Sequence, residues 1–174
     1  MDPAALSFSL ATERDVPAIV VLRTAVADRL TLEHGRGHWS TAVTENGVRQ
    51  AVATSRVLLA RLEGAIVGTL RLATKKPWAI DVSYFTPARR PLYLIDMAVT
   101  PELQRRGIGW RLLAHALEVA AAWPADAVRL DAYDAPAGAG GFYARCGWRE
   151  RGRVTYRDVP LIYFERVLTG PPAG

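Results

Sequence analysis

The sequence contains very little cysteine, no long apolar run and no long basic run. Cys146 is the single cysteine among 174 residues, so the chain can form no internal disulfide and fits a reducing compartment. No apolar stretch is long enough to span a bilayer, and no apolar signal-peptide core is visible after the acidic Asp2. These absences exclude a disulfide scaffold and lead us to expect a cytoplasmic protein without membrane contact.

Charge is also limited. Lys and Arg number 22 against 17 Asp and Glu, a formal net charge of +5, and no basic run is long enough to favour a nucleic-acid-binding module. A phosphate-rich cofactor would account for a good part of the excess. The histidines and the cysteine do not have spacings typical of a metal site, so we expect no metal. Because the chain has no long basic run, we expect no nucleic-acid partner either. The remaining composition, half of it hydrophobic, is that of a globular domain with a core of its own.

The central pattern is a continuous apolar run, a short basic turn with glycines, and then an amphipathic helix. Residues 92–99 are apolar enough for a strand buried on both faces. Residues 104–109 form the turn, and an apolar helical stripe follows to Ala122. First-turn N–H groups of a helix have no partner within it, and glycine lets backbone approach an anion closely. The stretch therefore predicts a phosphate-binding turn, although neither the G-x-G-x-x-G nor the G-K-[ST] pattern fits.

The remaining patterns predict alternating strands and helices. Strands are expected over 6–10, 56–62, 65–72, 92–99, 128–133, 149–156 and 161–167. Glu63-Gly64 joins the second and third of these and predicts a hairpin turn. Helices are expected after an N-cap at Asp15, around Val48, over 108–122 and over 142–146. The strand–helix–strand unit from 92 to 133 implies a parallel pair with a right-handed crossover. Residues 74–91 are expected to form a long loop that covers a substrate, with a further strand around 79–85 as an alternative.

The central turn resembles a known cofactor loop. Gln104, Gly107 and Gly109 fill the fixed positions of Q/R-x-x-G-x-G/A, the acyl-CoA pyrophosphate loop of the GNAT family of N-acetyltransferases. A second family signature, F/L-Y-x-x-x-G-F, is matched over 142–148, with tryptophan in the place of the final phenylalanine. The family's Asn-x-x-Ala before this signature is absent, since Pro136 stands at the asparagine position.

The resemblance covers residues 6–167 and implies an α/β GNAT fold. That fold is a mixed, mostly antiparallel sheet with a splayed parallel pair, flanked by about four helices. It implies one acyltransferase domain over 1–168, followed by a flexible tail over 169–174. Homodimers are common in the family.

The implied function is transfer of an acetyl group from acetyl-CoA directly to a primary amine of a small molecule or peptide. The alternatives are a CoA-binding regulatory domain without catalysis and an enzyme that uses another acyl group. The resemblance places the pantetheine arm and pyrophosphate against Met97, Ala98, Val99, Gln104, Arg105, Arg106, Gly107, Ile108, Gly109 and Trp110.

Two residues are catalytic candidates. Tyr143 matches the family's usual general acid, because a phenol with an ordinary pKa of about 10 stays protonated at neutral pH and can donate to a thiolate; its alternative is a packed aromatic ring with a solvated hydroxyl. Asp96 is the only charged residue in the central strand. It is either a general base or a carboxylate that attracts a cationic amine, or it is ion-paired with Arg71 or Arg129.

Other reactive side chains are weaker candidates. Glu33, His34, His38 and Trp39 lie where the family often builds its acceptor site, and His38 is either a base or an incidental loop histidine. Cys146 is either an acyl-carrying nucleophile or a packing residue at a helix end. None of these patterns names the acceptor amine.

Overall fold

The computed structural model describes residues 6–168, so the predicted tail over 169–174 lies outside the described residues. Within them, seven strands form one mixed sheet in the order β1-β2-β3-β4-β5-β7-β6, accompanied by four α-helices. The chain divides into two compact units, 1–73 with 95–116 and 74–94 with 117–174. Strand β4 is shared between them. The expected α/β class and mixed, mostly antiparallel sheet are confirmed, whereas the single-domain boundary stays a prediction.

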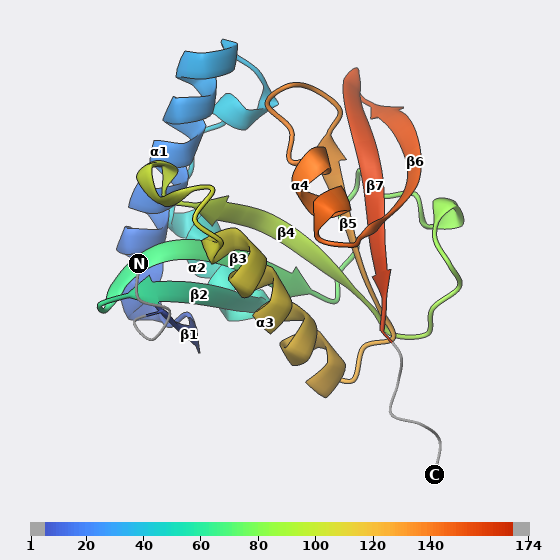
Figure 1. The fold of residues 1–174 in the computed structure, drawn as a ribbon, viewed down its shortest axis with the longest axis horizontal. Helices are drawn as coiled ribbons and strands as arrows, with labels where there is room; N and C mark the ends of the chain where they lie inside the picture. Colours follow the sequence, from blue (N-terminus) through green and yellow to red (C-terminus); the bar gives the residue numbers. More distant parts are fainter. Residues whose placement is uncertain (1–5, 169–174) are drawn as a thin grey trace. The chain divides into compact units, whose positions relative to one another are not determined.

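The first unit contains the N-terminal strands and two long helices (Figure 1). Its elements are β1 (Leu6–Leu10), α1 (Val16–His34), α2 (Glu45–Thr54), β2 (Arg56–Leu62), β3 (Ala65–Ala73), the second part of β4 (Pro91–Val99) and the start of α3 (Ile108–Ala122). Strands β1, β2 and β3 pair antiparallel. The predicted hairpin turn is confirmed, since Glu63 and Gly64 both have positive φ, at 49° and 86°.

Alternating residues of β2 send their side chains to two different helical layers. Val57 and Leu59 are buried against α1 and α2, in a cluster that includes Ile19 and Val48. On the opposite face β2 and β3 meet α3 closely at Gly68, where an added Cβ would lie 3.3 Å from Leu112 and 3.4 Å from Ala60. The two-residue period of the strand therefore produces a sandwich of helices around this half of the sheet.

The second unit contains the C-terminal strands. Its elements are the first part of β4, the end of α3, β5 (Ala127–Tyr133), α4 (Gly140–Arg145), β6 (Arg149–Tyr156) and β7 (Val159–Val167). Strand β4 pairs parallel with β5 from Pro91↔Ala127 to Tyr93↔Arg129, which confirms the predicted parallel pair. Strands β5, β7 and β6 pair antiparallel.

Strand β7 separates two environments. Ile162 and Phe164 pack against α4, where an added Cβ on Gly140 would lie 3.2 Å from Ile162. On the alternate face, Tyr163 packs on Phe85 of the long segment over 74–90, with ring centroids 5.3 Å apart. The long segment is thus tied to the sheet through β7.

The strand considered around 79–85 is wrong. Residues Val82–Tyr84 form a 3₁₀ turn instead. The Tyr163 hydroxyl accepts the N–H of Asp81 at 3.1 Å and donates to the carbonyl of Ala79, while the Asp81 carboxylate accepts the N–H of Ser83 at 3.0 Å. Because side chains take these backbone groups, the segment curls rather than joining the sheet.

Candidate functional site

The predicted turn follows β4 directly and is fastened to it. The N–H of Thr100 donates to the carbonyl of Val67 at 2.9 Å, and a 3₁₀ turn over Pro101–Leu103 follows. The Gln104 amide Nε2 donates to the carbonyl of Val99 at 3.1 Å. The side chain of Gln104 therefore braces the end of β4, a role that sequence reasoning had not assigned to it.

The backbone of the turn is left-handed at two positions. Arg105 and Gly107 have φ of 59° and 82°, and nothing lies within 4 Å of a Cβ added to Gly107. Glycine is therefore favoured there by the backbone angle and not by lack of space. The first intrahelical bond runs from the N–H of Arg111 to the carbonyl of Gly107 at 3.0 Å. The N–H groups that precede Arg111 belong to the first turn of α3, which has no intrahelical acceptors for them, and they can donate to an anion.

The side chains of this turn divide by burial. Arg105, Arg106 and Gly107 are exposed and Trp110 is 59% exposed, whereas Ile108 is buried. Ile108 thus anchors the helix start in the core, and the two arginines add positive charge where the helix dipole already favours an anion. Residues 104–110 thus place two exposed arginines beside the N-terminus of α3.

Strand β4 changes conformation just before the residues expected to contact a cofactor. Asp96 has φ of 56° in the middle of the strand, a left-handed conformation that is uncommon outside glycine and typical of a β-bulge. Met97 and Val99 are half-buried and Ala98 is buried. This left-handed residue immediately precedes the positions where the resemblance implies backbone contacts to a pantetheine arm.

Asp96 lies between two arginines. Its Oδ1 accepts from Nη2 of Arg23 and its Oδ2 accepts from Nε of Arg71, both at 2.9 Å. The alternative of an ion pair with Arg71 is confirmed, and the alternative with Arg129 is wrong because Arg129 pairs with Glu165. Arg23 was missed, although the sequence signalled it: a charged residue four positions after Ile19 interrupts the apolar stripe of α1.

Tyr143 lies in α4, in the second unit. Its ring contacts Phe142, Trp148 and Phe164 at centroid distances of 5.3, 5.8 and 5.9 Å, and it is only 5% exposed. Burial, with the charges of Asp131 and Cys146, raises the pKa of Tyr143 well above its ordinary value. The phenol is therefore protonated at neutral pH, and the alternative of a solvated hydroxyl does not describe this residue.

The two histidine candidates, His34 and His38, lie at the end of α1 and in the loop that follows it. The Trp39 indole donates to the carbonyl of Gly35 at 3.0 Å and packs edge-on to His34, with centroids 6.5 Å apart. His34 lies 3.9 Å from Glu33. Nothing in this geometry singles out His38 as a base.

The remaining nucleophile candidate is disfavoured. Burial raises the pKa of the Cys146 thiol, an effect only partly opposed by Arg145, so the thiolate needed for nucleophilic attack is scarce at neutral pH. Among residues 6–168, no group of three or more His, Cys, Asp or Glu side chains could hold a metal ion. No helix in the same range is long and apolar enough to cross a membrane.

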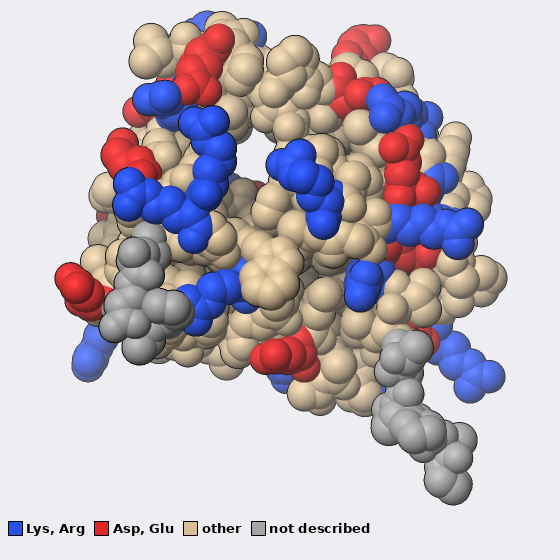
Figure 2. All heavy atoms as spheres, in the orientation of Figure 1, with Lys and Arg blue, Asp and Glu red and all other residues tan. Residues whose placement is uncertain are grey.

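Basic and acidic side chains are interspersed on the face drawn in Figure 2. Figure 2 shows Lys and Arg spread over the visible face with Asp and Glu between them. Several arginines are ion-paired, as in Arg61 with Asp15 and Arg153 with Asp134. A continuous basic stripe, the footprint of a nucleic-acid-binding protein, is not seen on this face.

Comparisons with known proteins agree with this geometry. A family model described as the acetyltransferase (GNAT) family matches residues 26–148. No curated protein matches the chain.

Solved structures share the fold at low identity. A ribosomal-protein-alanine N-acetyltransferase from Brucella melitensis has a TM-score of 0.71 and 21% identity, covering 93% of this chain and 99% of that one. A putative acetyltransferase from Salmonella typhimurium, solved with its cofactor acetyl-CoA, has a TM-score of 0.69 and 16% identity, covering 97% of each chain. An N-acetyltransferase from Staphylococcus aureus has a TM-score of 0.67 and 14% identity, covering 94% and 99%.

Proposed function

Because the chain belongs to the GNAT family of acetyltransferases, we propose that it transfers the acetyl group of acetyl-CoA directly to a primary amine of a small molecule or peptide. The observation that supports this most is the turn between β4 and α3, with its left-handed Arg105 and Gly107 and the start of the intrahelical bonds of α3 at the Gly107 carbonyl. A structural neighbour was solved with acetyl-CoA. A cytoplasmic location stays a prediction from the lone cysteine.

In the proposed complex, the chain binds the two ends of the cofactor by different means. Backbone N–H groups over 105–110, with the side chains of Arg105 and Arg106, would hold the pyrophosphate. Backbone groups of Met97, Ala98 and Val99 would pair with the pantetheine arm in the manner of an added strand. Gln104 would act indirectly, by fixing the end of β4 against the turn.

The proposed reaction needs few groups from the protein. A neutral amine attacks the thioester carbonyl, the tetrahedral oxyanion is stabilised by a backbone N–H, and the C–S bond breaks to release the CoA thiolate. The proton lost by the amine passes to a base or to water, and the thiolate gains one from an acid. Tyr143 is the proposed acid. Its raised pKa keeps it protonated, but it also makes full transfer to a thiolate less favourable, so a hydrogen bond to the leaving sulfur is the role that best fits its environment.

The cofactor step is tested by titrating the purified protein with acetyl-CoA and with CoA in a calorimeter. We expect saturable one-to-one binding that weakens at least tenfold in Gly107→Ala, because alanine disfavours the left-handed backbone that aims the N–H groups. Gly64→Ala is the matched control, since Gly64 has φ of 86° and also has nothing within 4 Å of an added Cβ. Equal binding by the two variants, or none by the wild type at low salt, would contradict the cofactor assignment.

Catalysis is tested separately, by CoA release with a panel of amines. Transfer that falls at least tenfold in Tyr143→Phe supports the enzyme and the role of the phenol. Saturable acetyl-CoA binding without transfer to any amine would instead favour a CoA-binding regulatory domain.

A further inference from the structure

Two arginines and one aspartate form a cluster on the face of the first unit that α1 covers: Arg23 of α1, Arg71 of β3 and Asp96 of β4. We propose that this cluster binds the carboxylate of the acceptor, and that the acceptor is therefore an amine that carries a carboxylate, such as a free amino acid. This inference rests on the proposed acetyl transfer and adds the chemical class of its substrate.

The first argument is charge. Two guanidinium groups share one carboxylate, so the cluster keeps one positive charge in excess. The other ion pairs recorded for arginines of the first unit give each arginine a carboxylate of its own: Arg29 with Glu33, Arg49 with Glu13 and Glu45, and Arg61 with Asp15. The excess at the cluster favours an anion as its missing partner.

The second argument is hydrogen-bonding capacity. A guanidinium carries five N–H donors, and within residues 6–168 Asp96 is the only hydrogen-bond acceptor recorded for either Arg23 or Arg71, through one nitrogen each. The donors that remain on two converging planar groups match the two oxygens of a carboxylate.

The third argument is burial. The side chains of Arg23, Arg71 and Asp96 are 24%, 26% and 29% exposed. Solvent therefore reaches the outer edges of these side chains. The cavity that they line is only about 10 Å³ in volume, so a bound carboxylate would have to displace neighbouring side chains.

The fourth argument is position along β4. Asp96, with its left-handed backbone, immediately precedes Met97, where the proposed cofactor arm begins. In an α-amino acid the carboxylate and the amine are attached to the same carbon, so holding the first group near Asp96 holds the second near β4. A polycationic amine would be repelled by the excess charge.

The test compares acceptors that differ only in the anionic group. A panel of L-amino acids is assayed for acetyl transfer, each beside its carboxamide and its decarboxylated amine. We expect kcat/KM for the best amino acid to exceed that of both analogues by at least tenfold. Analogues that react as well as the amino acid would overturn the proposal even if acetyl transfer itself is confirmed.

Variants then assign the preference to the cluster. Arg23→Gln and Arg71→Gln should each reduce the ratio between amino acid and amide at least tenfold, and Arg71→Lys should restore only part of it because lysine lacks the planar fork. Arg61→Gln, which breaks an ion pair of similar exposure, and Arg29→Gln, which lies exposed on the same helix as Arg23, should leave the ratio unchanged. A preference that survives both cluster variants would contradict the assignment.

A binding measurement keeps the inference separate from the proposed function. Calorimetric titration with the same amino acid and amide, in the presence of CoA, needs no catalysis. Tighter binding of the amino acid, lost in Arg71→Gln, would support the carboxylate site even if no acetyl transfer occurred. Equal binding of the two ligands by the wild type would overturn the site even if transfer occurred.

Discussion

Each unit of the molecule contains one carboxylate between two arginines, and the two clusters differ in what surrounds them. In the second unit, Glu165 lies 3.2 Å from Nε of Arg129 and 3.7 Å from Nε of Arg151. Glu165 is 2% exposed and Arg129 is 4% exposed. In the first unit, Asp96 and its two arginines are each about a quarter exposed.

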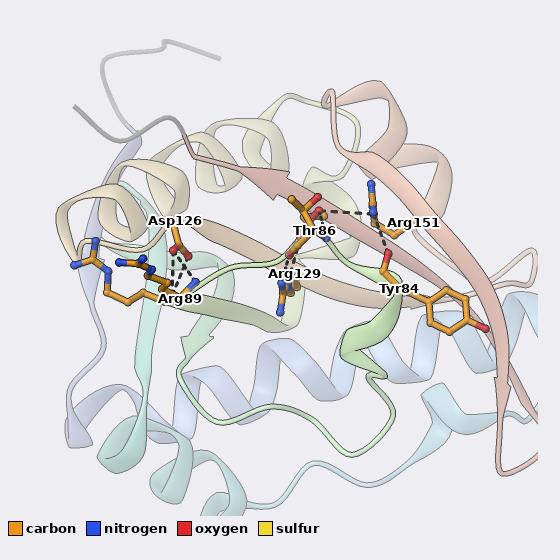
Figure 3. Close-up of polar contacts among 8 residues, drawn as sticks. Tyr84, Thr86, Arg89, Asp126, Arg129 and Arg151 are labelled. Carbon is orange, nitrogen blue, oxygen red and sulfur yellow. Dashed lines mark hydrogen bonds and ion pairs between the residues drawn. The ribbon is translucent and has the colours of Figure 1, made fainter. Parts of the chain in front are cut away.

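The backbone completes the cluster of the second unit. Figure 3 shows Arg129 donating to the carbonyl of Thr86 and Arg151 donating to the carbonyl of Tyr84. The N–H of Thr86 donates to Glu165 at 3.2 Å, and the Arg129 guanidinium also lies 5.0 Å from the Phe85 ring centroid. Polar and aromatic neighbours from the 74–90 segment thus satisfy the charges.

The comparison separates a structural network from a candidate binding site. A buried charge cluster is tolerable when its donors and acceptors are filled by the protein, as they are around Glu165. Among residues 6–168, the cluster at Asp96 has the same charge count with no recorded backbone partner for its arginine side chains, which is the property expected of a binding site. Removing a charge should therefore affect mainly stability in the second unit and mainly substrate choice in the first.

The largest effect on stability is expected from Glu165→Gln. The substitution keeps the shape of the side chain but leaves Arg129 buried without its counter-charge, so the free energy of unfolding should fall by about 3–5 kcal/mol. Denaturant unfolding measures the change. Glu150→Gln, which breaks the exposed pair with Arg153 on β6, should cost less than about 1 kcal/mol. Similar losses in the two variants would contradict the buried, structural role of Glu165.

A smaller contrast is expected between two buried aromatic residues of the second unit. The Tyr163 hydroxyl bonds Asp81 and Ala79, so Tyr163→Phe should cost about 1–3 kcal/mol. The buried indole Nε1 of Trp148 has no hydrogen-bond partner in the described structure. Trp148→Phe loses packing contacts but also removes this unsatisfied donor. The two effects should largely cancel, so the free energy of unfolding should change by less than about 1 kcal/mol. Thermal and denaturant unfolding of both variants measure these changes. A larger loss of stability in Trp148→Phe than in Tyr163→Phe would contradict this account.

The sequence was informative wherever a pattern is local. The apolar run before residue 100 predicts a strand and Glu63-Gly64 predicts a hairpin, and the structure has both. The glycine at 107 is predicted to lie in a phosphate-binding turn, and the structure adds that its backbone is left-handed. Partners across the fold could not be read in this way. Asp96 was visible as a lone charge, but choosing Arg71 and Arg23 over Arg129 requires knowing which side chains lie on one face of a sheet.

The same limit explains the error around 79–85. The segment is rich enough in β-forming residues to suggest a strand, yet the side chains of Tyr163 and Asp81 take the backbone groups that a strand would use. A contact from a residue some eighty positions away in the sequence has no local signal.

A further effect, dependent on pH, is expected at Asp126. Its carboxylate accepts the N–H of Arg89 at 2.8 Å and of Arg90 at 3.0 Å (Figure 3). Burial alone would raise the pKa of Asp126, but these N–H bonds outweigh it and leave the pKa lowered. Its stabilisation is therefore present above the unfolded pKa of about 3.9 and is lost as pH falls through the lower folded pKa.

Asp126→Asn should accordingly cost about 1 kcal/mol at pH 7, with the difference from wild type shrinking below about pH 4. Unfolding curves collected from pH 7 to pH 3 measure it. Asp158→Asn is the control, since Asp158 is exposed and its positive φ of 66° suits asparagine equally well. A difference from wild type that does not depend on pH would show that the charge of Asp126 is not what matters.

The smallest effect on stability is expected from Asp96→Asn, and it is the variant that tests the open cluster most directly. Asparagine tolerates the left-handed backbone of this position, and the ion pairs are partly exposed, so the loss should be below about 1 kcal/mol. The substitution raises the net charge of the cluster and releases donors of Arg23 and Arg71, so KM for a carboxylate-bearing amine should stay the same or fall.

Because each oxygen of Asp96 already accepts from a guanidinium, we expect kcat of Asp96→Asn to fall less than tenfold. A general base would behave differently: its loss would lower kcat by about 10²–10⁴-fold and remove the acidic limb of the pH–rate profile. That result would return Asp96 to the reaction itself and leave the two arginines as its supports.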